Sequence, residues 1–250
     1  FGLVPRTQDP DEAVIVPMKA VRMDLIPESE WVPRIRERQE KKARNCDRWR
    51  VGNAGKPIPF VDQGSYGYCW GHGPVNAQMM MRANMNLPYR ALSAFSVCSP
   101  LKNGADEGAW GALALEYMVK AGAGTQDLWP QGRVRLPETA EGTTSRAANK
   151  LVGSWMDLAA PVWDRNLSKA QIITLLLNDI PVVGDFNWWG HCVAILDPVI
   201  VTGDRIDVVI VNSWKGWGGF FEAGDGMAVL GGSKAWPDNA VAPGELVVAA

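Results

Sequence analysis

The sequence has few of the residues that reactive chemistry needs and no segment that would cross a membrane. It holds four cysteines and two histidines among 250 residues, and four cysteines are too few for a disulfide scaffold. The longest apolar runs, such as residues 208–211, fall far short of the roughly 18 residues that span a bilayer. No basic stretch followed by an apolar one opens the chain, so we expect no secretory signal.

The overall balance of residues is that of a folded globular protein. Hydrophobic residues make up 47% and charged residues 21% of the chain. The net charge is only −2, which argues against nucleic-acid binding by the whole chain. The charge is unevenly spread, because residues 31–50 carry a net +5 and the other 230 residues a net −7. A solvated helix face is the simpler interpretation of this basic stretch, and a tether to an acidic partner is the alternative.

The two ends of the chain differ from its middle. Prolines interrupt the first 33 residues at Pro5, Pro10, Pro17, Pro27 and Pro33, so we expect residues 1–50 to form an extended, basic N-terminal arm. Residues 51–234 are expected to form the main domain, and residues 235–250 a C-terminal tail. Both ends could contact neighbours in a larger assembly.

Helical patterns precede strand patterns along the main domain. Apolar side chains at helical spacing predict a helix around Val75, a second at 110–121 closed by Gly122, and a third that starts at a capping box of Ser168 and Gln171. Short β-rich runs follow at residues 182–186, 192–196, 199–201, 206–213 and 227–230. The sequence therefore predicts an α+β fold, with a helical lobe over about 51–177, an antiparallel β lobe over about 178–234, and a cleft between them.

Three polar residues stand where a thiol-based active site would need them. Cys69 lies at the start of the first of these helices, where the helix dipole favours the thiolate. His191 opens a predicted strand and could serve as the base. Asn212, at the end of the next long strand, could hold the imidazole in one orientation.

These positions resemble the three signatures of the papain-like cysteine protease family. Residues 63–70 read QGSYGYCW. This segment matches the family's nucleophile motif at five positions: the Gln, both Gly residues, the Cys and the Trp. His191 starts a strand as in the family, and residues 212–218 read NSWKGWG, close to the family's Asn motif. His191 and Asn212 lie 122 and 143 residues after Cys69, beside the roughly 130–150 of the family.

The resemblance implies a fold and a set of roles. It implies a two-lobed papain-like fold in which Cys69 attacks a peptide carbonyl, His191 forms an ion pair with the thiolate, and Asn212 orients the ring. Gln63 would donate to the oxyanion, while Trp70 belongs to the nucleophile motif and Trp214 would cover the His–Asn pair. The reaction would need no metal and no organic cofactor, and its substrate would be a protein or peptide.

Some positions depart from the family pattern. Tyr66 replaces a cysteine of the family's loop disulfide, so its partner position, Cys98, is expected to be a thiol, which favours a reducing cytoplasm or a virus particle over secretion or a lysosome. The family's groove segment is replaced at residues 104–108. Pro74 falls five positions into the first helix, and the hairpin before His191 is short.

Other functions remain open from the sequence. The chain could be a catalytically silent papain-like module that serves as a structural or binding component of a larger assembly, such as a virus particle. A transglutaminase-like or amidase site is disfavoured by Asn212, where an Asp is expected. Zinc binding by Cys69, His72, His191 and Cys192 lacks a C-x-x-C pair, and His72 is expected to be a packing or groove residue. Trp188 and Trp189 are expected beside the cleft on its leaving-group side.

Overall fold

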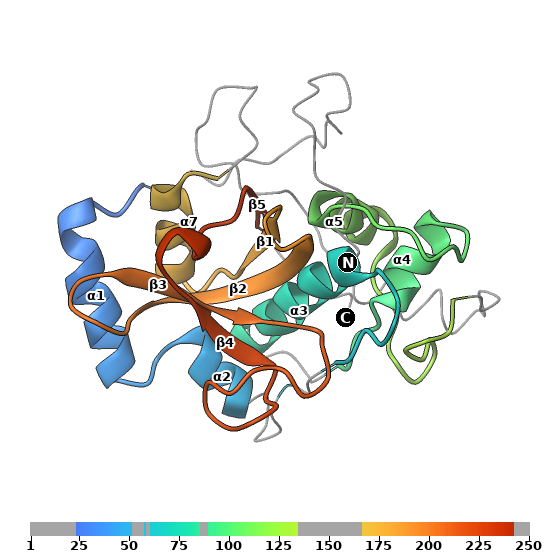
Figure 1. Cartoon of the computed structure of the whole chain (residues 1–250), viewed down its shortest axis with the longest axis horizontal. Helices are drawn as coiled ribbons and strands as arrows, with labels where there is room; N and C mark the ends of the chain where they lie inside the picture. The colour runs from blue at the N-terminus through green and yellow to red at the C-terminus, as the bar shows by residue number, and fades with distance from the viewer. Residues whose placement is uncertain (1–23, 52–57, 59–60, 86–89, 135–166, 243–250) are drawn as a thin grey trace.

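The structure is a computed structural model that describes residues 24–51, 58, 61–85, 90–134 and 167–242 (Figure 1). Its helices are α1 (Glu28–Glu40), α2 (Asn45–Val51), α3 (Cys69–Asn84), α4 (Phe95–Leu101), α5 (Gly111–Ala121) and α7 (Lys169–Leu177). Its strands are β1 (Val182–Phe186), β2 (His191–Ile200), β3 (Ile206–Val211), β4 (Met227–Leu230) and β5 (Asn239–Val241), with a short 3-10 helix η2 (Gly232–Lys234) before β5. Helices followed by strands confirm the α+β prediction.

The strands form one antiparallel sheet in the order β4-β3-β2-β1-β5. The predicted strands at 182–186 and 227–230 are confirmed. The prediction of separate strands at 192–196 and 199–201 is wrong, because β2 continues through Asp197 and Pro198 with a bulge in its register against β3. A β-bulge absorbs an irregular residue without ending the pairing.

The sheet is covered on both faces. Along β2, Cys192 and Ala194 belong to the core cluster that contains the α3 side chains, whereas Val193 and Ile195 belong to the cluster that contains those of α7. Successive strand side chains point to opposite faces, and because both faces are covered β2 is buried from His191 to Val199.

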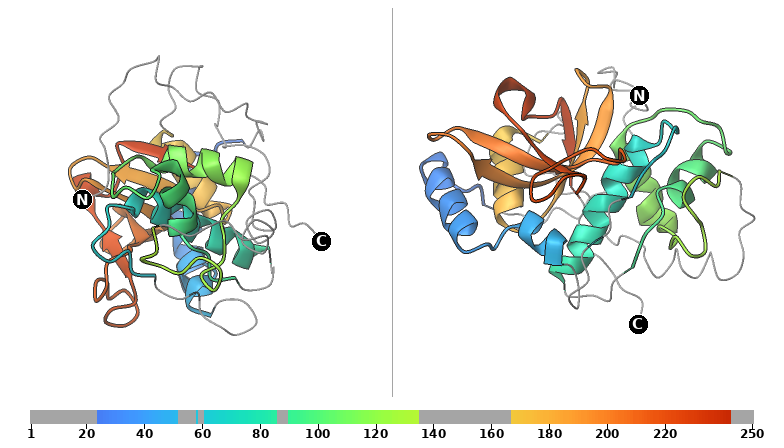
Figure 2. Two further views of the ribbon diagram at one scale, coloured as in Figure 1. Left: turned by 90° about the vertical axis from the view of Figure 1, so that its right-hand side faces the viewer. Right: turned by 60° about the horizontal axis from the view of Figure 1, so that its bottom comes forward.

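α3 lies between the sheet and the other helices of the helical lobe (Figures 1 and 2). It packs against β2 and β1 on one side and against α4 and α5 on the other. The N-terminal end of α3 therefore lies at the boundary between the helical lobe and the sheet. The helix continues through Pro74, so this proline does not end it.

The predicted helix ends are present in α5 and α7. Gly122 closes α5 with φ of 79° and donates its N–H to Met118 O, a left-handed conformation that glycine adopts easily. At the start of α7, Ser168 and Gln171 make both hydrogen bonds of the capping box. α7 packs against β1 and β2, so it lies with the sheet, although the sequence assigned it to the helical lobe.

The N-terminal segment is mostly helical and packed where the structure describes it, so the prediction of an extended arm is wrong for residues 28–40 and 45–50. Trp31 and Ile35, one turn apart on α1, are buried against Ile173 and Leu177 of α7. Burying this apolar pair favours a helix despite Pro33 within it. Residues 1–23 of the predicted arm lie outside the described residues.

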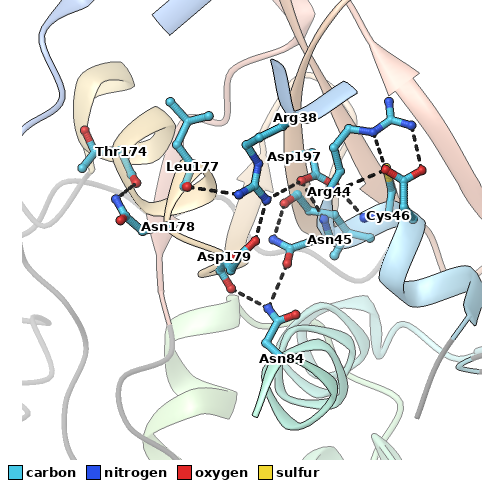
Figure 3. Close-up of polar contacts among 12 residues, drawn as sticks. Arg38, Arg44, Asn45, Cys46, Asn84, Thr174, Leu177, Asn178, Asp179 and Asp197 are labelled. Atoms are coloured by element: carbon cyan, nitrogen blue, oxygen red, sulfur yellow. Dashed lines mark hydrogen bonds and ion pairs between the residues drawn. The ribbon is translucent and has the colours of Figure 1, made fainter. Parts of the chain in front are cut away.

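A buried polar network joins α1 and α2 to the sheet (Figure 3). The fully buried Asp197 carboxylate accepts the backbone N–H groups of Asn45 at 2.9 Å and Cys46 at 2.6 Å. The Arg38 guanidinium lies 3.8 Å from Asp197 and 2.5 Å from Asp179. Asn45 Nδ2 also donates to Leu196 O at 2.8 Å. Asp197 thus caps the first turn of α2 from inside the sheet.

The C-terminal part differs from the predicted tail as well. β5 pairs with β1 and therefore forms an edge of the sheet, while residues 243–250 lie outside the described residues. Within the described part of the chain, no helix combines the length and apolar character needed to span a membrane.

Candidate active site

Cys69 is the first residue of α3, as the sequence predicted, and its side chain is fully buried. The turn before it is held by the segment that precedes α5: Gly67 N donates to Asp106 Oδ1 at 2.7 Å, and Tyr68 Oη donates to Ala105 O at 2.7 Å. Trp70 Nε1 reaches the same segment, donating to Glu107 O at 3.1 Å. These bonds fix the thiol at the positive end of the helix dipole.

Two glycines let α3 approach its neighbours closely at this end. A Cβ on Gly73 would lie 3.0 Å from Cys192 Sγ and 3.2 Å from the Val193 carbonyl carbon, and a Cβ on Gly71 would lie 2.1 Å from Cys98 Sγ. Gly73 follows Cys69 by about one helical turn, and Cys192 directly follows His191. The fold therefore brings the start of α3 against the start of β2, which carry the predicted nucleophile and base.

His191 is buried and held by the predicted asparagine. Its Nε2 lies 2.6 Å from Asn212 Oδ1, and the Ser213 backbone N–H donates to the same Oδ1 at 2.7 Å. An atom that accepts from a backbone N–H is the amide oxygen, so His191 Nε2 carries a hydrogen and Nδ1 is the ring nitrogen with a lone pair. Nδ1 is buried and makes no hydrogen bond to a described residue.

The environment of His191 favours its neutral form. Burial lowers the pKa of His191 to about 4, although the hydrogen bond to Asn212 acts in the opposite direction. A neutral imidazole can accept a proton from a thiol at physiological pH. The ion pair with Cys69 that the resemblance implied stays a prediction.

Indole rings enclose the imidazole. The Trp214 ring is stacked on His191, with centroids 4.2 Å apart and planes at 30°. Trp189 lies 4.7 Å from the same imidazole and packs edge-on against Trp214 at 5.4 Å. Trp214 therefore lies where the sequence predicted a cover for the His–Asn pair, and Trp189 adds a second ring.

Gln63 connects the nucleophile turn to the asparagine strand. Its backbone N–H donates to Ser213 O at 2.8 Å, and its Oε1 accepts from Ser213 Oγ. Its Nε2 donates to Tyr66 O at 2.8 Å, so one of the two amide hydrogens is used within the turn. Sequence reasoning selected Gln63 but missed Ser213, whose position directly after Asn212 was the available signal.

The remaining cysteines and His72 occupy the core around this site. Cys98 and Cys192 are buried thiols without a disulfide, which confirms the expectation for Cys98. His72 is fully buried with its ring edge-on to Phe95, as expected of a packing residue. No three His, Cys, Asp or Glu side chains among the described residues converge as metal ligands.

Comparison with known proteins identifies the fold. No family model matches the chain, and no curated protein matches it by sequence. Among solved structures it is similar to xylellain, a cysteine protease from Xylella fastidiosa, with 15% identity over 98% of this chain and 96% of that chain and a TM-score of 0.62.

Two further solved structures show the same likeness. Procathepsin L 3 from the larval midgut of Tenebrio molitor is 14% identical over 87% of this chain and 90% of that chain, with a TM-score of 0.59. Bromelain from Ananas comosus, in complex with the inhibitor E64, is 16% identical over 75% of this chain and 93% of that chain, with a TM-score of 0.55. The chain therefore has the papain-like two-lobed fold. These structures lend no support to the prediction of a virus-particle component.

Proposed function

We propose that the chain is a cysteine peptidase that hydrolyses peptide bonds through Cys69 and His191. The observation that carries this proposal is the buried His191–Asn212 hydrogen bond of 2.6 Å at the end of β2 that faces the start of α3. A buried, oriented base opposite a thiol on a helix N-terminus has the composition of a nucleophilic active site. The fold that the chain shares with cysteine proteases is a second, weaker support.

The proposed reaction starts from a neutral Cys69 thiol and a neutral His191 imidazole. Cys69 Sγ–H transfers its proton to His191 Nδ1, and the thiolate attacks the substrate carbonyl carbon. The C–N bond then breaks as the imidazolium returns the proton to the leaving amine, which leaves a thioester on Cys69. Water, deprotonated by the same imidazole, hydrolyses the thioester and restores the thiol.

Charge on the carbonyl oxygen must be stabilised during both steps. The backbone N–H of Cys69, in the first turn of α3, and Gln63 Nε2 are the donors we assign to it. Because Gln63 Oε1 is fixed by Ser213 and one amide hydrogen by Tyr66, the direction of the second amide hydrogen is fixed as well. Trp214 keeps water from the His191–Asn212 bond by lying on the ring.

An epoxysuccinyl inhibitor tests the proposal directly. We expect intact-mass analysis of folded protein to show one covalent adduct on Cys69, and digestion of a diverse peptide library to show cleavage. Cys69→Ala should abolish both results. Cys98→Ala is the matched control, because it removes a buried neighbouring thiol that the mechanism does not use.

Two results would reject the proposal. One is a folded protein in which Cys69 is not labelled, and the other is peptide cleavage that persists in Cys69→Ala. A folded protein that is not labelled at Cys69 and cleaves no peptide would favour the alternative of a silent papain-like module.

A further inference from the structure

An exposed indole, Trp188, stacks on the Trp189 ring that contacts the buried histidine. Trp188, in the turn between β1 and β2, is 47% exposed and is the one aromatic residue among the exposed large apolar side chains of the described residues. An apolar ring of this size at the surface is a common feature of recognition sites. Its position beside a candidate active site suggests that it contacts substrate.

Trp188 is held in place by the residues around it. Its ring is stacked on Trp189, with centroids 5.5 Å apart and planes at 14°, and packs edge-on against Phe186 at 6.2 Å. The turn is closed by Trp189 N donating to Phe186 O at 3.1 Å, and Asn187 N donates to Asp238 Oδ2 at 2.7 Å. The indole is therefore a preorganised surface, which lowers the entropy lost on binding.

A cation accompanies the indole. Lys234 Nζ, from η2, lies 4.7 Å from the Trp188 ring centroid. No ion pair joins Lys234 to a carboxylate within the part of the chain that the structure describes. The carboxylate that contacts this turn, Asp238, accepts the Asn187 N–H. Trp188 and Lys234 together offer an exposed part of an indole ring and a positive charge.

The indole pair extends outward from the imidazole. The Trp189 ring lies 4.7 Å from the His191 ring. Trp188 stacks in turn on Trp189, so the three rings form a series from His191 to Trp188. In the proposed reaction His191 protonates the leaving amine, so side chains that extend from this ring lie beside the leaving half of the substrate.

We propose that Trp188 and Lys234 bind the leaving half of the substrate and select a short leaving peptide that has an aromatic side chain and a free C-terminal carboxylate. The aromatic side chain packs on Trp188, and the carboxylate pairs with Lys234. This inference rests on the proposed peptidase function and specifies its substrate class. It assigns preference for cleavage close to the C-terminus of a peptide.

Acyl transfer tests this inference without a known natural substrate. Benzyloxycarbonyl-glycine p-nitrophenyl ester acylates Cys69 and releases p-nitrophenol. The amine of an added dipeptide then attacks the thioester in competition with water, forming an amide and restoring the thiol. The ratio of amide product to acid product measures binding of the dipeptide on the leaving side only.

The dipeptides Gly-Phe, Gly-Ala and Gly-Phe amide separate the contribution of the aromatic side chain from that of the C-terminal carboxylate. We expect Gly-Phe to be used about fivefold better than either of the others, since each lacks one contact and a fivefold preference corresponds to about 1 kcal/mol. Trp188→Ala should remove the preference for Phe over Ala, and Lys234→Gln should remove the preference for the carboxylate over the amide. Lys41→Gln, directly after the end of α1, is the control for loss of a surface lysine.

The outcomes distinguish this inference from the proposed function. A burst of p-nitrophenol on Cys69 with equal use of the three dipeptides, or with preferences that survive both substitutions, overturns the inference and leaves the peptidase intact. Failure to form any acyl-enzyme rejects the proposed function itself. Trp188→Phe, which keeps an aromatic ring, should retain most of the preference for Phe.

Discussion

At the scale of single residues, the site combines side chains that the motifs identify with contacts that they do not. Cys69, His191 and Asn212 could be selected from local sequence because each has a characteristic neighbour pattern. The bonds of Gln63 to Ser213 join residues 150 positions apart, and no local pattern reports such a pairing. Sequence reasoning therefore identified the residues of the proposed site but missed the long-range hydrogen bonds that hold them.

The pH below which Cys69 stops reacting with the epoxide should be set by protonation of His191. Below a pKa of about 4 the imidazole is protonated and cannot accept the proton of Cys69, so the rate of epoxide labelling should fall as pH decreases through about 4. Asn212→Ala removes a hydrogen bond that favours the imidazolium, and should move this limit to lower pH. Asn212→Asp supplies a negative charge and should move it to higher pH.

Labelling rates between pH 3.5 and 7, measured while circular dichroism shows folded protein, would check this prediction. A wild-type limit near the ordinary histidine pKa of about 6.5 would contradict the lowered pKa of His191. Shifts in the same direction for both variants would contradict the assignment of His191 as the base.

His72 should make the protein sensitive to acid. Burial lowers the pKa of His72 to about 3, with His191 contributing in the same direction. The folded-state pKa of His72 lies below the unfolded value of about 6.5, so the unfolded chain binds a proton more readily than the folded protein. The free energy of unfolding is therefore unaffected by His72 above about pH 6.5 and falls as pH decreases toward 3, by about 1.4 kcal/mol per pH unit at most.

His72→Phe tests this point. Phenylalanine has a similar shape and does not titrate, so its free energy of unfolding, measured in urea at pH 7, 5 and 4, should fall less steeply than that of the wild type. Parallel slopes for the two proteins would show that His72 is not a source of the acid sensitivity.

At the scale of elements, the glycine contacts of α3 set the distance between helix and sheet. A Cβ on Gly71 would lie 2.1 Å from Cys98 Sγ, so Gly71→Ala should destabilise the protein by about 1–3 kcal/mol through overpacking. Cys98→Ala removes the clashing sulfur, and the double variant should recover part of that loss. Gly219→Ala is a matched control because nothing lies within 4 Å of its Cβ position.

Urea unfolding of the four proteins of this double-mutant cycle would measure the coupling. Additive effects of Gly71→Ala and Cys98→Ala would mean that the two positions are not in contact. Slower epoxide labelling in Gly71→Ala than in Gly219→Ala would show that the same contact also positions Cys69.

The elements predicted correctly are those with local signals. The capping box before α7 and the closing glycine of α5 lie within a few residues of the helices that they end, and both are present. Asp197 and Pro198 have the local character of a turn, yet β2 continues through them. The partners of Asp197 are backbone N–H groups about 150 residues earlier, so only the folded chain shows why this carboxylate is buried.

At the scale of the whole molecule, α1 and α2 are parts of the folded body. Apolar side chains of α1 form one core cluster with α7, and Cys46 and Trp49 of α2 belong to the main core. The Gln39 side chain exchanges two hydrogen bonds with the backbone of Ile200. An inhibitory segment that is removed to activate an enzyme would not be expected to complete its core in this way.

Truncation separates a structural segment from a removable one. A chain that starts at Asp24 keeps every described contact of α1 and α2, and we expect its free energy of unfolding to stay within about 1 kcal/mol of that of the full chain. A chain that starts at Gly52 lacks the N–H groups of Asn45 and Cys46 and the Arg38 guanidinium that contact the Asp197 carboxylate. It also loses Trp31 and Ile35 and so exposes the apolar side of α7 that they cover, and burial of such apolar side chains contributes about 1.5–3 kcal/mol each. The shorter chain should therefore be unfolded or aggregated, as judged by circular dichroism and size-exclusion chromatography. If it were instead folded and labelled faster by the epoxide than the full chain, α1 and α2 would be an inhibitory segment.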